Sequence, residues 1–249
     1  MFKTIAAVLA LSTAVVAPAA YADEAESSDI TITGNVSLTS QYRLRGISQT
    51  DEDIALQGGI TIAHSSGFYV GTWASNLAGQ GSFGGDNLEL DLIAGYTKAV
   101  GGVTLDGGVI YYVYPGTGGD FNYIDIYGAV SLPLGPVNTK VSAYYAPKDK
   151  SIGDKDNLWV SGDFAFPIKE TPITLKAHVG YTSGGSALAG PSGHYLDYAA
   201  GADLAFKNLT LNVSYIDTNI KKTGANAFYA IGGHDIVDGA VVATLTAAF

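Results

Sequence analysis

The sequence of 249 residues contains no cysteine, and charged residues make up only 14% of it. Without cysteine the chain can form no disulfide bond, although small exported domains often use disulfides to compensate for a thin core. This chain must therefore hold together in another way. A closed ring of hydrogen-bonded strands is one such way.

Long apolar runs are also absent after the first 22 residues, although 47% of all residues are hydrophobic. A membrane-spanning helix needs about 20 consecutive apolar residues, so no such helix is expected in this part of the chain. The apolar residues alternate with polar ones instead, and 32 glycines and 16 tyrosines are distributed among them. A membrane barrel distributes its residues in this way, with lipid outside and polar side chains inside.

Basic residues are scarce: 13 Lys and Arg stand against 23 Asp and Glu, which gives a formal net charge of −10. No basic run or cationic helix face is visible, so we expect no nucleic-acid partner and no binding of anionic lipid through a basic patch. Four glycines in residues 78–86 imitate a phosphate-binding loop. They stand between two expected strands and not before a helix, so we expect no nucleotide and no other cofactor.

The first 22 residues have the features of a secretory signal peptide. Lys3 supplies the positive charge, Ile5–Leu11 is a short apolar segment, and Ala20-Tyr21-Ala22 fits the small-x-small pattern of a cleavage site. We predict a signal peptide over residues 1–22 and a single exported domain over residues 23–249. Losing Lys3 and no acidic residue changes the formal net charge to −11.

Strict alternation with a period of two recurs along the exported part. Apolar and polar residues alternate from Asn35 to Arg45, from Leu88 to Thr97 with Ile93 as an exception, and from Ile173 to Thr182. A period of two over about ten residues is the signature of a barrel strand, and a helical period fits none of these segments.

About twelve strands are expected, with an error of two. They are 34–45, 54–64, 68–77, 87–98, 103–114, 122–132, 137–146, 157–166, 173–183, 195–206, 209–218 and 236–249. Short turns near 65–67, 100–102, 133–136, 167–172 and 207–208 alternate with longer loops near 46–53, 78–86, 115–121, 147–156, 184–194 and 219–235. Outer-membrane barrels have short periplasmic turns and longer outer loops. The sequence therefore predicts an all-β, antiparallel, up-and-down transmembrane barrel.

Aromatic residues gather at both ends of the expected strands. Those at the loop end are Tyr42, Tyr111, Tyr112, Tyr114, Tyr144, Tyr145, Tyr181 and Tyr215, and those at the turn end are Phe68, Tyr96, Phe164, Phe166, Phe206 and Phe249. Amphipathic rings lie at the headgroup level of a membrane, so these residues predict two interfacial belts.

The last strand carries a separate signal. Residues Val237, Gly239, Val241, Ala243, Leu245, Ala247 and Phe249 alternate onto one face and end on an aromatic residue. This ending resembles the signal by which outer-membrane barrels are delivered to their assembly machinery. We therefore predict that Phe249 is recognised by that machinery.

Three stretches resemble the TorF family of suspected porins, also called Gcw_chp. They are Val36–Leu77, Leu88–Gly116 and Asn122–Ser131, and the most specific parts are YRLRGISQT (Tyr42–Thr50) and GFYVGTWASN (Gly67–Asn76). From about Leu132 onward the likeness is in pattern alone. The resemblance implies an outer-membrane barrel and a suspected pore, and it brings no established substrate or catalytic residue.

Ionisable residues collect at the expected inward positions, which makes them candidates to line a pore. The basic ones are Arg43, Arg45, Lys140 and Lys176, the acidic ones are Glu89, Asp91, Asp106, Asp125, Asp163, Asp197, Asp203 and Asp238, and His178 joins them. These residues predict either a carboxylate lining opposed by Arg43 and Arg45, with a net preference for cations, or a salt-bridged interior that conducts little. A barrel of about twelve strands is of intermediate width, so its size does not decide between the two.

The residue pattern favours no enzyme and no metal site. His178 is expected inside the barrel, the other histidines lie beside a turn or in loops, and no G-x-S-x-G motif is present. We therefore predict a passive outer-membrane channel for small solutes or ions, mildly selective for cations, in contact with outer-membrane lipid. The alternative is a non-conducting structural or adhesive barrel that acts through its outer loops. The sequence shows no oligomer interface.

Overall fold

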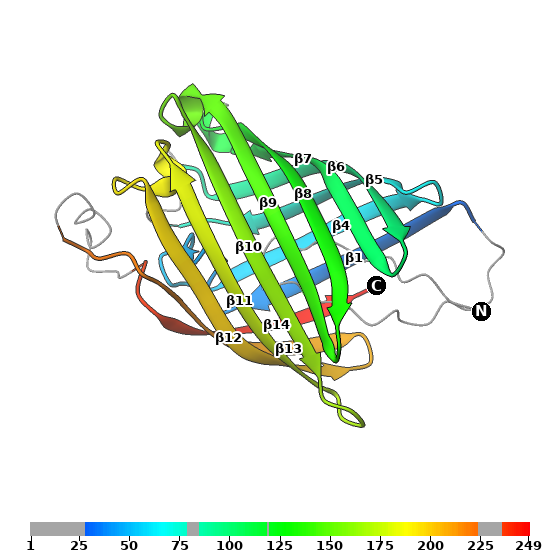
Figure 1. The fold of residues 1–249 in the computed structure, drawn as a ribbon. Coiled ribbons are helices and arrows are strands. Elements are labelled where there is room, and N and C mark those ends of the chain that lie inside the picture. The colour runs from blue at the N-terminus through cyan, green and yellow to red at the C-terminus, as the bar shows by residue number, and fades with distance from the viewer. Residues whose placement is uncertain (1–27, 79–84, 119, 224–235) are drawn as a thin grey trace.

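The structure is a computed structural model that describes residues 28–78, 85–118, 120–223 and 236–249. The proposed signal peptide, residues 1–22, lies outside the described residues. The described chain forms a closed antiparallel barrel, drawn in Figure 1.

Twelve strands make the wall, as the sequence predicted. They are β1 (Ile30–Thr39), β4 (Ala55–His64), β5 (Phe68–Asn76), β6 (Leu88–Val100), β7 (Val103–Val113), β8 (Tyr123–Leu134), β9 (Val137–Asp149), β10 (Lys155–Pro167), β11 (Ile173–Gly184), β12 (His194–Phe206), β13 (Leu209–Thr218) and β14 (Ala240–Ala248). Two short strands, β2 (Arg43–Leu44) and β3 (Ile47–Ser48), pair only with each other. Single 3₁₀ turns, η3 (Pro115–Thr117), η4 (Lys150–Ile152) and η5 (Ala187–Ala189), lie in the longer loops. No helix in the described part of the chain is long and apolar enough to cross a membrane.

The ring closes between β1 and β14, which pair from Asn35↔Ala248 to Thr39↔Thr244. The backbones of Gly34 and Phe249 exchange two further hydrogen bonds, of 2.8 and 2.9 Å. A Cβ atom at position 34 would stand 2.7 Å from the Phe249 ring, so glycine is what lets this ring lie against the seam. Closure leaves no unpaired sheet edge, which the hydrocarbon core of a membrane requires.

The two faces of the wall follow the predicted alternation. Large apolar side chains such as Ile62, Leu92 and Val179 are exposed on the outside, where lipid covers them. Their neighbours along the strands point into the lumen. The aromatic belt at the turn end is confirmed, because Phe68, Tyr96, Phe164, Phe166, Phe206 and Phe249 are all exposed on the outside.

The belt at the loop end is only partly as predicted. Tyr111, Tyr145, Tyr181 and Tyr215 are exposed outside, but Tyr42, Tyr112, Tyr114 and Tyr144 are buried inside the barrel. The physical reason is that successive residues of a strand alternate between the two faces of the sheet, so adjacent residues such as Tyr111 and Tyr112 face opposite sides.

The predicted limits fail at the first and last strands. Strand β1 runs from residue 30 to 39 instead of 34 to 45, because the chain turns into the lumen after Thr39. Strand β14 begins at residue 240 instead of 236, and Val237, predicted to share a strand face with Val241 and Leu245, is 1% exposed and packs beside Ile236. The other ten predicted strands agree with the structure within three residues at each end.

A matched pair of substitutions on β4 tests which face meets lipid. Ile60 faces outside and is 49% exposed, whereas its neighbour Thr61 faces the lumen. We expect Ile60→Arg to lower the free energy of unfolding into vesicles by about 2–4 kcal/mol. Thr61→Arg should lower it much less, because its charge reaches water in the lumen. Equal losses in urea titrations would contradict the assignment of faces.

Candidate functional site

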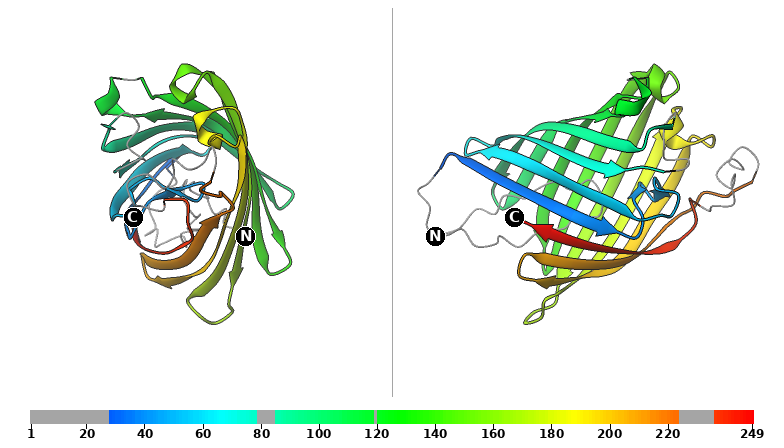
Figure 2. Two further views of the ribbon diagram at one scale, coloured as in Figure 1. Left: turned by 90° about the vertical axis from the view of Figure 1, so that its left-hand side faces the viewer. Right: turned by 180° about the vertical axis from the view of Figure 1, so that it is seen from behind.

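The segment between β1 and β4, residues 40–54, folds into the barrel, and we call it the inner loop. Tyr42, Arg43, Leu44, Ser48 and Thr50 of this loop are all exposed by 9% or less. Figure 2 shows this segment, in blue, inside the ring of strands near the end that carries the longer loops. The sequence predicted an ordinary strand end and an outer loop here, which is wrong.

The tip of the inner loop is a tight hairpin. Arg43 pairs with Ser48 and Leu44 with Ile47, so the two residues of the turn are Arg45 and Gly46. Both have positive φ, 50° and 82°, as a two-residue hairpin turn of type I′ requires. This conformation costs a non-glycine residue such as Arg45 about 1–3 kcal/mol, which other contacts must offset. A Cβ at Gly46 would lie 2.6 Å from Thr218.

Hydrogen bonds fix the base of the inner loop. The Tyr42 amide donates to Oγ1 of Thr50 at 3.0 Å, and the Gln49 amide donates to the Tyr42 carbonyl at 2.7 Å. The Ala78 amide donates to the Gln49 carbonyl at 3.0 Å, and a parallel bridge joins Thr50 to Ala78. The base is thereby tied to the chain segment that follows β5.

Arg45 reaches the far wall of the barrel. Its guanidinium donates to the carboxylate of Asp125 on β8 at 2.9 Å and to the side chain of Asn157 on β10 at 2.6 Å. It also stacks over the Trp159 ring, 5.2 Å from its centre. Around the ring, β10 lies five places from β1 in one direction and β8 five places in the other. The inner loop therefore spans the lumen, and we call the contact of Arg45 with Asp125 and Asn157 the clasp.

Arg43 holds the inner loop to the segment before β14. Its Nη1 donates to the carbonyls of Gly46 at 2.9 Å and Asp238 at 2.7 Å. The Asp238 side chain accepts from Lys222 at 2.5 Å and is about half exposed. Neither Arg43, Arg45 nor Asp238 lies on a barrel strand, so their predicted strand positions are wrong. The chain leaves the sheet after Thr39 and rejoins it at Ala55, and Asp238 lies just before β14, which begins at Ala240.

Carboxylates gather beside the clasp. Glu89, Asp91 and Asp125 are each exposed by 1% or less. Glu89 accepts from the Tyr42 hydroxyl at 3.0 Å and from the Tyr114 hydroxyl at 3.2 Å, which ties the inner loop to β6 as well. Among the described residues, neither carboxylate oxygen of Asp91 has a hydrogen-bond partner. This part of the lumen is consequently acidic, with Arg45 beside it.

A second polar network lies closer to the turn end. His178 bridges Asp163 at 2.7 Å and Asp197 at 2.8 Å, and the Trp159 indole also donates to Asp197. Lys140 stands opposite Asp163 in the pairing of β9 with β10. Three further pairs complete the network: Tyr69 with Asp106 at 2.7 Å, Lys176 with Asp203 at 3.8 Å, and Asn212 with Asp203 at 2.6 Å.

The lumen differs between its two ends. At the loop end Tyr112, Tyr114 and Glu89 are fully buried, since the inner loop fills the space between opposite walls. At the turn end small inward residues such as Thr33, Gly59 and Thr61 are only half-buried. The barrel is thus packed at the loop end and, toward the turn end, open on the side of β1 and β4, whereas Thr210, Asn212 and Thr246 on β13 and β14 are 8% exposed or less.

The family model described as a bacterial protein of unknown function, Gcw_chp, matches residues 23–249. The chain belongs to the Gcw_chp family. YRLRGISQT, the most specific part of the resemblance seen in the sequence, is the inner loop's hairpin. A search of curated proteins finds no significant match.

Solved structures similar to this Gcw_chp barrel are outer-membrane porins. The NanC porin has a TM-score of 0.56 at 10% identity and covers 88% of this chain and 99% of its own. The KdgM porin has a TM-score of 0.56 at 8% identity, covering 87% and 98%. A complex of KdgM with disordered oligogalacturonate has a TM-score of 0.55 at 9% identity, covering 88% and 98%. At these identities the likeness establishes the fold, an outer-membrane porin-like barrel.

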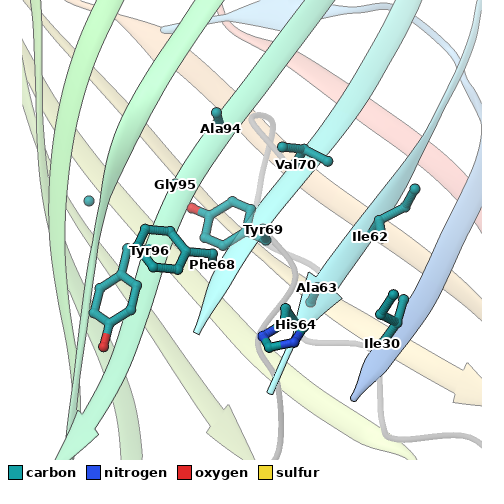
Figure 3. A pocket seen from close by; sticks show the side chains of 11 residues that line it. Ile30, Ile62, Ala63, His64, Phe68, Tyr69, Val70, Ala94, Gly95 and Tyr96 are labelled. Atoms are coloured by element: carbon teal, nitrogen blue, oxygen red, sulfur yellow. The ribbon is translucent and has the colours of Figure 1, made fainter. Parts of the chain in front are cut away.

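A shallow hollow of about 580 Å³ lies at the turn end of β1 and β4–β7 (Figure 3). Ile62, Phe68 and Val70, which line it, are among the side chains exposed on the outer face. The hollow is therefore part of the lipid-facing surface and not of the lumen. Among the described residues, no three His, Asp or Glu side chains are arranged to hold a metal ion.

A cysteine reporter in this cysteine-free chain tests whether the clasp holds the inner loop inside. Ser48 is fully buried in the hairpin, so Ser48→Cys should react slowly with a maleimide. Breaking a buried ion pair costs about 3–5 kcal/mol, so adding Arg45→Ala should raise the labelling rate at least about tenfold. Adding Lys148→Ala, which removes an exposed pair with Asp154, should not change it. An unchanged rate with Arg45→Ala would refute the clasp.

Proposed function

We propose that this Gcw_chp protein is an outer-membrane channel for small solutes or ions, mildly selective for cations, whose inner loop acts as a gate. The observation that carries the proposal is the difference between the ends of the lumen. A polar lumen that is open at the turn end is blocked at the loop end by a single segment, which a few side-chain contacts hold to the far wall. Outer loops folded inward are a means of restricting a barrel's lumen.

The cation preference rests on the balance of inward charges. Seven carboxylates face the lumen: Glu89, Asp91, Asp106, Asp125, Asp163, Asp197 and Asp203. Four basic side chains oppose them: Arg43, Arg45, Lys140 and Lys176. A lumen with this excess of negative charge attracts cations and repels anions. The predicted pore-lining residues keep that role in the proposal, with Arg43 and Arg45 in the gate and Asp238 at the rim.

The charge balance also bears on the ligand of a similar porin. KdgM was solved with oligogalacturonate, a chain of acidic sugars. An acidic lumen disfavours such a polyanion, so we do not extend this ligand to the present chain.

The packing of the loop end favours a second candidate, a non-conducting structural or adhesive barrel that acts through its outer loops. Tyr112, Tyr114 and Glu89 are fully buried at that end. If the inner loop never leaves the lumen, no solute can pass through the barrel. In either case the proposal keeps residues 1–22 as a signal peptide and Phe249 as the element that the assembly machinery recognises.

Single-channel recording in planar bilayers under a salt gradient distinguishes the two candidates. Asn157→Ala removes one partner of Arg45 without changing any charge. We expect this variant to open more often than the parent protein. Its reversal potential should have the sign expected of a cation-selective channel. Arg45→Ala should open more often still, because it removes both bonds of the clasp.

The matched control is again Lys148→Ala, which leaves the inner loop untouched. It should behave like the parent protein. Folding of each variant is checked by gel electrophoresis, as a difference in migration between unheated and heated samples. If folded parent, Asn157→Ala and Arg45→Ala proteins are all silent, the channel is refuted and the second candidate stands. Anion-selective reversal would refute the proposed cation preference alone.

A further inference from the structure

The inward charges of the barrel occupy one side of the lumen only. Every Asp, Glu, Lys and His side chain at an inward strand position lies on the seven consecutive strands β6–β12, from Glu89 and Asp91 on β6 to Asp197 and Asp203 on β12. The five strands that complete the ring, β13, β14, β1, β4 and β5, carry no charged inward residue. We call these two sides of the lumen the charged arc and the hydroxyl arc.

Hydroxyl and amide groups line the hydroxyl arc. One row runs across all five strands through the pairs Thr210↔Thr246, Thr246↔Ser37, Ser37↔Gln57 and Gln57↔Ser75. Two bonds within this row link Ser37 to Thr246 at 2.8 Å and Gln57 to Ser75 at 3.3 Å. A hydroxyl group has one donor and two acceptor positions, so each keeps capacity for a further partner.

The hydroxyl arc also runs along the barrel axis. Strand β1 presents Thr31, Thr33, Asn35, Ser37 and Thr39 inward, one after another, over its whole length. This track begins at the open turn end and finishes at Thr39, whose hydroxyl donates to the Gln41 carbonyl at the start of the inner loop. A solute that follows the track therefore arrives at the proposed gate.

The charged arc offers much less to a neutral solute. Several of its groups are engaged with one another, as the bridge of His178 between Asp163 and Asp197 and the pair of Lys176 with Asp203 illustrate. Its long side chains also fill space that the short Thr and Ser residues of β1 and β14 leave free, whereas β5 contributes the larger Tyr69 and Trp73 to the hydroxyl arc. A neutral solute rich in hydroxyl groups finds exchangeable hydrogen-bond partners along the hydroxyl arc, and no charge to desolvate.

We propose that the hydroxyl arc is a track for neutral polyhydroxylated solutes, such as monosaccharides and polyols, separate from the charged arc that sets ion selectivity. The inference rests on the proposed channel function and names one class of its solutes. Weak, multiple and interchangeable hydrogen bonds suit permeation, because binding must allow both entry and exit.

The test measures sugar flux and ion conductance on the same proteins, all in the Arg45→Ala background that opens the gate. Thr33 and Thr61 face each other across β1 and β4 and are half-buried in the open part of the lumen. Replacing both by valine removes two hydroxyls at nearly constant volume. Sorbitol influx into proteoliposomes should fall about fivefold, the equivalent of one lost hydrogen bond of about 1 kcal/mol, while single-channel conductance in KCl stays similar.

Two controls isolate the effect. Thr72→Val makes the same change on the exposed outer face of β5 and should alter neither measurement. Lys140→Met, on the charged arc, should shift the reversal potential toward cations without lowering the ratio of sorbitol influx to conductance.

The outcomes separate the two proposals. If Thr33→Val/Thr61→Val leaves sorbitol influx unchanged, or lowers influx and conductance in equal proportion, the hydroxyl track is refuted while the channel stands. If the Arg45→Ala background neither conducts nor takes up sorbitol, the channel and the track are refuted together.

Discussion

A backbone in the hydrocarbon core of a membrane must satisfy its own hydrogen bonds, and the rest of this structure depends on that requirement. It obliges β1 to pair with β14 as well as with β4, and it brings Phe249 against Gly34 at the seam. Once the ring is closed, the parity of each strand decides which side chains meet lipid. Every polar side chain on the other face must then find its partners within the lumen.

The inner loop follows from this constraint. The carboxylates Glu89, Asp91 and Asp125 are buried at one end of the lumen, and a buried charge without a partner is costly. Arg45 pairs with one of them, Asp125, from the tip of a hairpin whose backbone is itself strained. Its bonds to Asp125 and Asn157 offset that strain and lessen the burial cost of the Asp125 carboxylate. The same contact places a segment of chain across the lumen.

The sequence predicted the barrel strands well, but it predicted poorly which segment fills the lumen. Period-two alternation is a local property, so ten strands were predicted within three residues. The alternation of Tyr42, Arg43, Leu44 and Arg45 fits a barrel strand equally well, and it hid the end of β1 at Thr39. The turn-forming Gly46 and the charged residues 51–53 were the available signals that the chain leaves the sheet. They do not tell whether a loop turns outward or inward, because that depends on Asp125 and Asn157, far along the chain.

The arrangement of inward charges was predictable only in part. Parity identified Glu89, Asp106 and His178 as inward residues, and the structure places them inside. Their confinement to one side of the lumen needs the order of strands around the closed ring, which no local pattern contains.

A reversible disulfide measures most directly whether the inner loop closes the barrel. The Ser48 amide donates to the Ile236 carbonyl at 2.8 Å, so cysteines at these two positions are close enough to bridge, and no native cysteine interferes. Single-channel conductance of Arg45→Ala/Ser48→Cys/Ile236→Cys would be recorded before and after reduction in the same bilayer. The account predicts a silent oxidised protein that opens when reductant is added. Equal conductance in both states would mean that the inner loop is not the barrier.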